Sequence, residues 1–460
     1  MPSFTRFRAN FVLPISQPAQ RDAEVVVGNG LVHAVRPVQP AGADAVVDFG
    51  DAMLLPGLVN AHTHLDYTAM RGAVEDLPFF PWIRRLTAMR AALDPDDWAA
   101  SAAWGALEAL TGGVTSVGDC SPTGAAADAL RSAGLGGVVF HEVFGIGSKA
   151  GIHEALVQVA GDVERLQRTT AGTGVQIGIS PHALYTVPAA WFGALQQFAA
   201  GRGLRVCTHV AESVDECRLI RSGEGEFATM LSRRGFTIQP GGGTCVEYLD
   251  AHGGIGPTTL LVHGVQLSER DAEICRGSGA TWVHCPKSNA KLGAGTASLA
   301  LLRRASSGGP ALGTDSVVSN NGMDMFEEMR FGVLAQRAAT RCAESPSPSE
   351  FLEMATIHGA RALGFTDRGT LDAGNRADLC AVSLEHPGML PCYSPEAALV
   401  FAATARDVAA VAVGGEMLYD ASAGPKHAQR FLRADAQAAR IRLNRAQDHI
   451  REWRDQNRGT

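Results

Sequence analysis

Long uninterrupted apolar runs are missing from this sequence, although 46% of its 460 residues are hydrophobic. No run approaches the ~18 residues that a membrane-spanning helix requires. The N-terminal stretch MPSFTRFRANFVLPISQPAQRD also lacks the continuous apolar segment of a secretory signal peptide. We therefore expect a cytoplasmic protein that makes no contact with a membrane.

Patterns of cysteine and of basic charge are also weak. The nine cysteines are scattered, odd in number and never spaced as CxxC, which is typical of free thiols in a reducing compartment. The formal net charge is −7, and no stretch alternates basic residues with aromatics. We therefore expect a small-molecule substrate and no nucleic-acid partner.

Short apolar runs alternate with helical patterns through the middle of the chain. Such runs are typical of parallel strands that are buried on both faces. Eight of them over about 310 residues fit a closed (β/α)8 barrel of the TIM type, which we assign to residues 54–365. The eight runs are Leu54–Ala61, Val114–Asp119, Gly137–Val143, Val175–Ser180, Leu204–His209, Thr259–His263, Thr281–His284 and Ala311–Thr314.

Both ends of the chain carry a different pattern, made of short β-type runs punctuated by glycine and proline. In the N-terminal part these runs are Phe11–Leu13, Glu24–Val27, Leu31–Val35 and Ala45–Asp48, and similar runs recur at 369–383 and 408–419. We expect residues 1–53 and 366–425 to pair into one small, composite β-sandwich domain.

Two further segments interrupt the alternation. Residues 213–258 form a long insertion after the fifth run, whose glycine-rich part suggests a lid, a role that the sequence leaves open. Residues 426–460 space apolar side chains four and three apart, which predicts an amphipathic C-terminal helix. This stripe favours docking on its own chain over pairing with a partner helix. Its members are Ala428, Leu432, Ala436, Ala439, Leu443, Ala446, Ile450 and Trp453.

Ionisable side chains cluster where the predicted barrel strands end, which is the catalytic face of such a barrel. His62 and His64 alternate along one strand, so both side chains share a face and can bind one metal ion. The other members, which follow or end the fifth, sixth and eighth runs, are His209, Glu212, His263 and Asp315. Each residue alone is more simply a satisfied polar group, but together they predict a metal centre.

A series of short motifs surrounds these residues. In chain order they are PGLVNAHTH (56–64), SPHALYT (180–186), HVAE (209–212), VHG (262–264), CPKSN (285–289), GTDS (313–316) and GNRADL (374–379). The set resembles the amidohydrolase superfamily, in the branch of chlorotriazine hydrolases, guanine deaminases and methylthioadenosine/S-adenosylhomocysteine deaminases. Segments 60–66 and 180–182 also resemble the aminofutalosine deaminases. The resemblance covers nearly the whole chain up to residue 420.

The resemblance implies one divalent metal ion bound by His62, His64, His209 and Asp315, with zinc expected and iron as the alternative. Imidazole nitrogens together with one carboxylate suit such an ion. Binuclear relatives place a carboxylated lysine at the end of the fourth strand, but the corresponding run here, Val175–His182, contains no lysine. We therefore expect a single metal ion.

The implied reaction is hydrolytic deamination. The metal would lower the pKa of a bound water toward ~7. Asp315 would accept a proton from this water while remaining a ligand, and His263 would hold the attacking oxygen. Glu212 would protonate the neighbouring ring nitrogen of the substrate. Amide hydrolysis needs no such extra acid, so Glu212 favours removal of an amino group from an aromatic ring.

The same resemblance indicates a 6-aminopurine nucleoside as substrate, such as 5′-deoxyadenosine, methylthioadenosine or aminodeoxyfutalosine. Trp82 is expected to line the pocket, His182 to contact the nucleoside and Ser319 to lie near the purine. A core role for Trp82 and loop-bracing roles for the other two fit equally well. Methylthioadenosine deaminases bind the ribose with a glutamate where this chain has Ala91. Arginines for a homocysteine carboxylate have no clear match, which disfavours S-adenosylhomocysteine.

Other functions remain open. The same site suits deamination of guanine or a pterin, or dechlorination of a triazine. A barrel of this superfamily that has lost its metal can also be a non-catalytic scaffold, although here every ligand is present. The family and the C-terminal helix are compatible with a homodimer.

Overall fold

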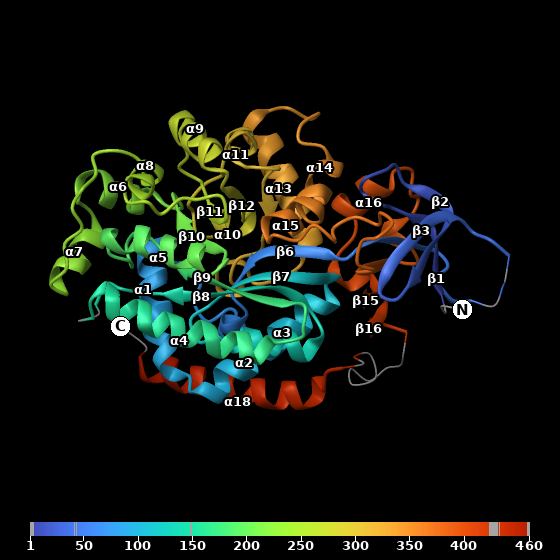
Figure 1. Cartoon of the computed structure of the whole chain (residues 1–460), viewed down its shortest axis with the longest axis horizontal. Helices are drawn as coiled ribbons and strands as arrows, with labels where there is room; N and C mark the ends of the chain where they lie inside the picture. Colours follow the sequence, from blue (N-terminus) through green and yellow to red (C-terminus); the bar gives the residue numbers. More distant parts are fainter. Residues whose placement is uncertain are drawn as a thin grey trace.

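The computed structural model of the chain describes residues 4–457 except 41, 43, 148, 149, 423–430 and 432. Its centre is a barrel of eight parallel strands that pair in sequence order, with helices around it (Figure 1). The expected (β/α)8 barrel is therefore confirmed. The barrel strands are β6 (Leu58–Thr63), β7 (Val114–Ser121), β8 (Gly136–Val143), β9 (Val175–Pro181), β10 (Val206–Val210), β11 (Thr259–His263), β12 (Thr281–His284) and β13 (Ala311–Leu312).

The barrel closes between its first and last strands. The backbone N–H of Asp315 donates to the carbonyl oxygen of His62 at 2.9 Å, and Thr63 forms a parallel bridge with Asp315. A Cβ atom at Gly313 would lie 2.7 Å from the backbone nitrogen of His62, so glycine permits this close approach. Closure thus brings His62 and Asp315 together at one mouth of the barrel.

One predicted barrel strand is in fact two strands. The run Leu54–Ala61 divides at Gly57, so that β5 (Ala52–Pro56) joins the accessory sheet and only β6 enters the barrel. A Cβ atom at Gly57 would lie 2.2 Å from the side chain of Thr115. A continuous apolar strand cannot be read as two from its hydrophobicity alone, and the break comes from the Pro-Gly pair. The expected domain boundary after residue 53 falls inside β5.

The accessory sheet contains strands from both ends of the chain, as expected. Its order is β16-β15-β14-β5-β1-β2-β3, with β4 paired to β1. Strand β5 connects the two contributions, because it pairs in parallel with β1 and antiparallel with β14. The remaining strands are β1 (Thr5–Val12), β2 (Gln20–Gly28), β3 (Leu31–Pro37), β4 (Ala45–Asp48), β14 (Leu379–Ser383), β15 (Val408–Val413) and β16 (Glu416–Asp420).

Helices follow most barrel strands, and several begin with a side-chain cap. Helix α2, for example, has a capping box in which Asp94 and Asp97 each accept from the other's backbone N–H. The helices between β6 and β10 are η1 (Leu65–Met70), α1 (Phe79–Met89), η2 (Arg90–Ala92), α2 (Pro95–Thr111), α3 (Ala125–Ala133), α4 (Ile152–Thr170) and α5 (Ala189–Gly201). The insertion 213–258 contains α6 (Val214–Ser222), α7 (Glu226–Arg233) and α8 (Cys245–Ala251).

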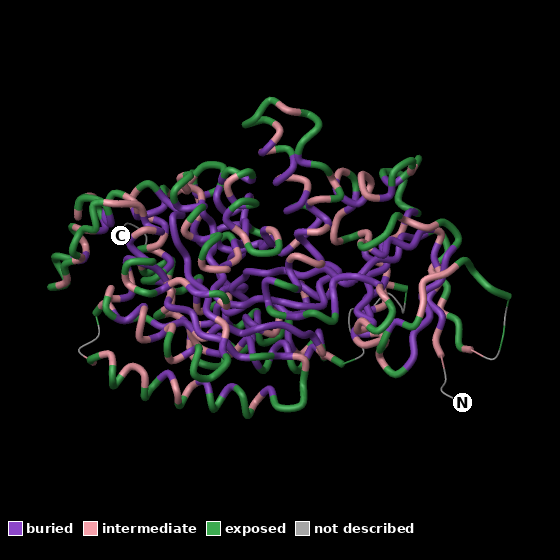
Figure 2. Tube along the Cα trace, turned by 45° about the horizontal axis from the view of Figure 1, so that its top comes forward, coloured by how far each residue is buried: buried purple, intermediate pink, exposed green. Residues whose placement is uncertain are grey.

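The second half of the chain adds further helices around the barrel and beside the accessory sheet. They are α9 (Glu269–Ser278), α10 (Pro286–Lys291), α11 (Leu299–Ala305), α12 (Val317–Asn320), α13 (Met325–Thr340), α14 (Pro348–Met354), α15 (Ile357–Ala362), η3 (Pro387–Met389), α16 (Pro395–Phe401) and η4 (Ala405–Asp407). Among the described residues, no helix is both long enough and apolar enough to cross a membrane. Buried residues run through the barrel and continue into the accessory sheet (Figure 2).

The C-terminal helix α18 (Ala436–Gln456) packs along α2 at the bottom of the molecule in Figure 1. Its buried face contains Leu443 and Ile450, and His449 Nδ1 lies 2.6 Å from Asp97 Oδ2. The predicted docking on its own chain is therefore confirmed. The helix begins at Ala436 rather than at residue 426, and the stripe positions Ala428 and Leu432 lie outside the described residues.

Candidate active site

Four predicted metal ligands converge at the mouth of the barrel. His209 Nε2 lies 3.3 Å from both His62 Nε2 and His64 Nε2, and Asp315 Oδ1 lies 3.5 Å and 3.4 Å from the same two nitrogens. Corners of a tetrahedron at this spacing lie about 2.1 Å from its centre, close to ordinary zinc–nitrogen and zinc–oxygen distances. The arrangement of donor atoms therefore fits a single divalent ion.

The pKa values of these histidines also indicate a site for a cation. Burial, and next the neighbouring His62, lower the pKa of His64 to about 3. Burial also lowers the pKa of His62, but Asp315 and Cys207 together outweigh this effect and raise that pKa to about 10. The Asp315 carboxylate thus favours one positive charge among the three histidines, where a metal cation would lie.

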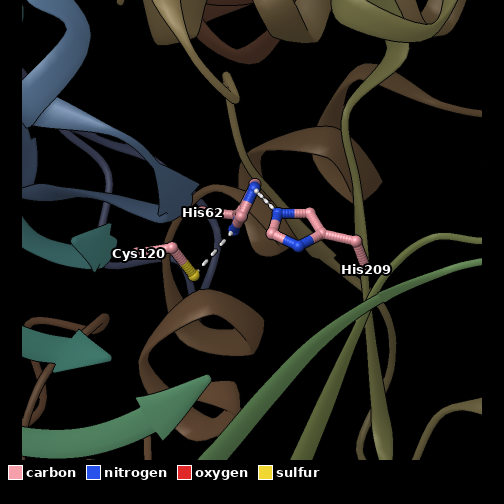
Figure 3. A group of neighbouring side chains, drawn as sticks. All are labelled: His62, Cys120 and His209. Atoms are coloured by element: carbon pink, nitrogen blue, oxygen red, sulfur yellow. Dashed lines mark hydrogen bonds between the residues drawn. The ribbon is translucent and has the colours of Figure 1, made fainter. Parts of the chain in front are cut away.

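Each ligand histidine is oriented by a contact behind its ring. His64 Nδ1 lies 2.9 Å from Cys120 O, and His209 Nδ1 lies 2.8 Å from His182 O. Figure 3 shows the third ring, His62, whose Nε2 faces His209 while its Nδ1 lies 3.8 Å from Cys120 Sγ. Such contacts fix the tautomer, so that Nε2 of each ring is directed to the centre.

Asp315 and His263 are held in unusual backbone conformations. Their φ angles are 60° and 79°, in the left-handed region that side chains other than glycine rarely adopt. Asp315 Oδ2 lies 2.5 Å from Ser288 Oγ and 2.9 Å from Ser319 Oγ, and His263 Nδ1 lies 2.9 Å from Asn289 Oδ1. The surrounding hydrogen bonds stabilise these conformations, which are typical of functional sites.

Ser319 differs from its predicted place. It was expected near the purine, but it is fully buried beneath Asp315 and does not line the cavity. The short helix α12 begins directly after Asp315, and this turns the Ser319 hydroxyl back onto the carboxylate. The structure therefore places Ser319 against the predicted metal ligand Asp315 and away from the cavity surface.

Glu212 lies in the same mouth, with its Oε1 3.7 Å from His263 Nε2. Only 5% of its surface is exposed. Burial, and next the nearby Asp315, raise the pKa of Glu212 well above the ordinary carboxyl range. The backbone N–H of Glu212 donates to Glu216 Oε2 at 2.9 Å, which fixes the loop. This shift favours the protonated form of the Glu212 carboxyl group, which is the form that can give a proton.

A cavity of about 490 Å³ lies above these groups. Its floor consists of the metal-ligand cluster with Glu212 and His263, and we call this set the floor. Its other side, which we call the apolar wall, comes from η1, α1 and the segment after β9. The wall residues are Tyr67, Phe79, Trp82, Ile83, Leu86 and Tyr185. Both Trp82 and His182 line the cavity, whereas none of the described lining residues is lysine or arginine.

Helix α7 of the insertion covers part of this wall. Phe227 stacks on Tyr185 with ring centroids 4.4 Å apart and packs edge-on against Phe80 at 5.0 Å. The insertion therefore contributes to the closed side of the cavity. Movement of residues 213–258 as a lid stays a prediction.

Glu142, which was not predicted as a site residue, lines the cavity at the end of β8. Its Oε1 is buried and lies 3.8 Å from both His64 Nδ1 and His182 Nε2. Burial raises the pKa of Glu142 to about 8. The residue could have been found from its place in the third apolar run, because a carboxylate at a strand's C-terminal end faces the catalytic mouth.

Comparisons with known proteins agree with this geometry. The sequence profile described as "Amidohydrolase family" matches residues 53–418. A 5-methylthioadenosine/S-adenosylhomocysteine deaminase from Nitratidesulfovibrio vulgaris is 33% identical over 410 residues, covering 88% of this chain and 85% of that protein. A 5′-deoxyadenosine deaminase from Methanothermobacter thermautotrophicus is 30% identical over 405 residues, with coverages of 87% and 89%.

Among solved structures, an adenosine deaminase from Xanthomonas campestris with bound zinc superposes with a TM-score of 0.85. The two chains are 28% identical, and the match covers 98% of this chain and 99% of the other. The shared fold extends over both the barrel and the accessory sheet, and the zinc in that protein agrees with a divalent metal ion here.

Proposed function

The chain belongs to the amidohydrolase family, and we propose that it is a metal-dependent deaminase of 6-aminopurine nucleosides. The reaction would exchange the 6-amino group of a 5′-modified adenosine for oxygen from water, with release of ammonia. The observation that carries this proposal is a buried carboxyl group, Glu212, beside a complete His62–His64–His209–Asp315 set. The first supplies the acid that an aromatic amine requires, and the second suits one metal ion.

The proposed metal ion is zinc, with iron as the alternative, and these four side chains would hold it. When bound, such an ion acts as a Lewis acid that makes water a nucleophile at neutral pH. Asp315, fixed through Oδ2 by Ser288 and Ser319, accepts the proton of the attacking water. His263, fixed by Asn289, orients the water toward the amino-bearing carbon.

Glu212 completes the proposed chemistry from the side of the substrate. Its protonated carboxyl group donates to the ring nitrogen next to the attacked carbon, so negative charge does not build up on the ring. As the tetrahedral adduct collapses, Asp315 returns its proton to the leaving amino group, which departs as ammonia. The hydroxyl proton of the adduct returns to Glu212, and the ring nitrogen of the 6-oxo product keeps its proton. Trp82 and His182 are proposed to contact the nucleoside, and Ser319 becomes a positioning residue for Asp315.

The apolar wall favours nucleosides whose 5′ group carries no charge. No lysine or arginine is among the described residues that line the cavity, and the guanidinium of Arg90 lies over the rings of Tyr67 and Phe144. A carboxylate on the 5′ group of the nucleoside would therefore be buried in the cavity without a counter-ion. We propose 5′-deoxyadenosine and methylthioadenosine ahead of aminodeoxyfutalosine and S-adenosylhomocysteine.

A substrate panel on zinc-reconstituted protein tests the proposal. We expect ammonia and the corresponding 6-oxo nucleoside from adenosine, 5′-deoxyadenosine and methylthioadenosine. Turnover restricted to guanine or a pterin, or release of chloride from a chlorotriazine without any nucleoside deamination, would contradict it. Protein that binds less than a stoichiometric amount of metal and turns over nothing would favour a scaffold.

A further inference from the structure

Glu142 is a buried carboxyl group that the proposed deamination does not use. Only 5% of the residue is exposed, and Oε1 has no hydrogen-bond partner among the described residues. Buried polar atoms in native proteins almost always have a partner, and an exception at the edge of a cavity indicates a missing ligand group. The unpaired oxygen of Glu142 therefore points to a donor that arrives with the substrate.

The two histidines nearest to this oxygen already make other contacts through their Nδ1 atoms. His64 Nδ1 contacts Cys120 O at 2.9 Å, so its proton is not available to Glu142, and Nε2 faces the ligand cluster. His182 Nδ1 lies 2.9 Å from Thr186 Oγ1. The Thr186 hydroxyl also donates to the carbonyl oxygen of Ala183 at 3.1 Å, so this contact occupies the Nδ1 side of the His182 ring. His182 Nε2 faces Glu142 Oε1 at 3.8 Å.

Glu142 Oε1 and His182 Nε2 thus lie side by side at the cavity, too far apart to form a hydrogen bond with each other. Hydroxyl groups that approach both atoms from the cavity suit this pair, because a hydroxyl can donate to the carboxylate and can either donate to an imidazole nitrogen or accept from its N–H. Glu142 lies beside His64 and His182, whereas Glu212 lies beside His263. With the purine base at Glu212, the sugar is the part of a nucleoside that reaches Glu142.

We propose that Glu142 is a specificity-determining residue that accepts hydrogen bonds from the 2′- and 3′-hydroxyls of the nucleoside's ribose. The inference rests on the proposed nucleoside deaminase function and adds the part of the substrate that the floor does not recognise. Its action does not depend on whether the carboxyl group is ionised, since either form accepts a hydrogen bond. Ribonucleosides are therefore preferred over their deoxy analogues.

The test compares kcat/KM for adenosine and for 2′,3′-dideoxyadenosine in the wild type, Glu142→Ala and Glu142→Gln. We expect Glu142→Ala to lower kcat/KM for adenosine by about 10- to 100-fold, as for loss of hydrogen bonds to a buried carboxylate, and to leave the dideoxy substrate unchanged. Glu142→Gln keeps one acceptor oxygen and should retain part of the preference. A matched control is His141→Asn, the preceding residue of β8, whose ring contacts Asp162 on α4 instead of lining the cavity.

Several outcomes would overturn the inference. Equal losses on both substrates would make Glu142 structural, and no loss on either would remove it from recognition. Loss of a second equivalent of zinc in Glu142→Ala would instead assign it to a metal site with His182 and His209. A wild type that deaminates adenosine and the dideoxy analogue equally well defeats the inference while the proposed function stands. A wild type that deaminates no 6-aminopurine nucleoside defeats both.

Discussion

The floor and the apolar wall of the cavity are built in different ways. Floor residues lie on or directly after barrel strands, where backbone carbonyls and buried hydroxyls fix His64, His209 and Asp315. Wall residues lie on η1, α1 and the segment after β9, and contact one another through aromatic packing. Rigid strand ends therefore supply the chemistry, while the connections between strands shape the space for a substrate. Changes to the floor should alter turnover, and changes to the wall should alter affinity.

The largest effect is expected from Asp315→Asn. This change removes a metal ligand and the proposed proton acceptor at once, so kcat should fall by about 10⁴-fold or more. Zinc content after reconstitution should fall as well. Metal analysis and ammonia release on the same sample measure both effects, and a fully active variant would refute the assignment.

Glu212→Gln should separate acid catalysis from metal binding. The amide cannot donate the required proton, so kcat should fall by about 10²- to 10⁴-fold. Bound zinc should remain at the wild-type level, because Glu212 is not one of the proposed ligands. Near-normal turnover in this variant would remove Glu212 from its proposed role.

Ser319→Ala should remove one of the hydrogen bonds that hold Asp315 in the floor. Loss of the hydroxyl contact with Asp315 Oδ2 should lower zinc affinity or kcat by about 10- to 100-fold, as for other groups that orient metal ligands. Combination with Ser288→Ala should give a less than additive loss, since both hydroxyls contact the same oxygen. Ser319→Thr, which keeps the hydroxyl, should restore zinc binding. If Ser319→Ala changed only KM, the residue would instead be a substrate contact.

A change in the apolar wall should alter KM instead of kcat. Trp82→Leu removes part of an aromatic surface that lines the cavity, so KM for nucleosides should rise by roughly 10-fold with little change in kcat. Steady-state kinetics on methylthioadenosine provide the measurement. A fall in kcat at constant KM would instead connect the wall to the chemistry.

The smallest effect is expected at the back of the wall, where α18 belongs to the same hydrophobic cluster as Phe79 and Trp82. His449→Ala removes the contact with Asp97 Oδ2. Because the imidazole is partly exposed, the loss of stability should be about 1 kcal/mol or less, visible as a small fall in Tm. Turnover by the zinc-loaded variant should be unchanged, and a lower kcat would show that α18 acts on the floor.

The sequence predicted the floor better than any other part of the molecule. Residues such as His62 and His64 are recognisable because the two-residue period of a strand places both on one face. Barrel topology then assigns His209, His263 and Asp315 to the same mouth without knowledge of any long-range contact. The strand period and the barrel topology that make these residues recognisable in the sequence also bring them together in the structure.

Other features depend on contacts that no local pattern contains. Ser319 was expected at the purine, but its place was decided by the turn into α12, which directs the hydroxyl to Asp315. Glu142 was passed over because its only signal was its place at the end of a strand, without a second residue at a telling spacing. The break at the Pro-Gly pair also needs glycine at position 57 to leave room for Thr115, which belongs to the next barrel strand. Such packing relations appear only when the strands are assembled.

Some expectations stay predictions. These are the domain limits at 1–53 with 366–425, 54–365 and 426–460, the homodimer, the cytoplasmic location and the absence of nucleic-acid binding. Limited proteolysis would locate the domain limits, and sedimentation would give the number of copies. The position of β5 between β1 and β14 suggests that the accessory sheet resists cleavage at residue 53.

The same strand has a consequence for synthesis of the chain on the ribosome. The pairing of Leu54 with Ala381 joins a strand made early to one made only after the whole barrel. Until then one edge of β5 has exposed backbone groups, and such unpaired edges favour association with other chains. Folding of the N-terminal sheet therefore has to wait for the C-terminal third of the protein, and chaperones that shield nascent strands should raise the yield of native enzyme.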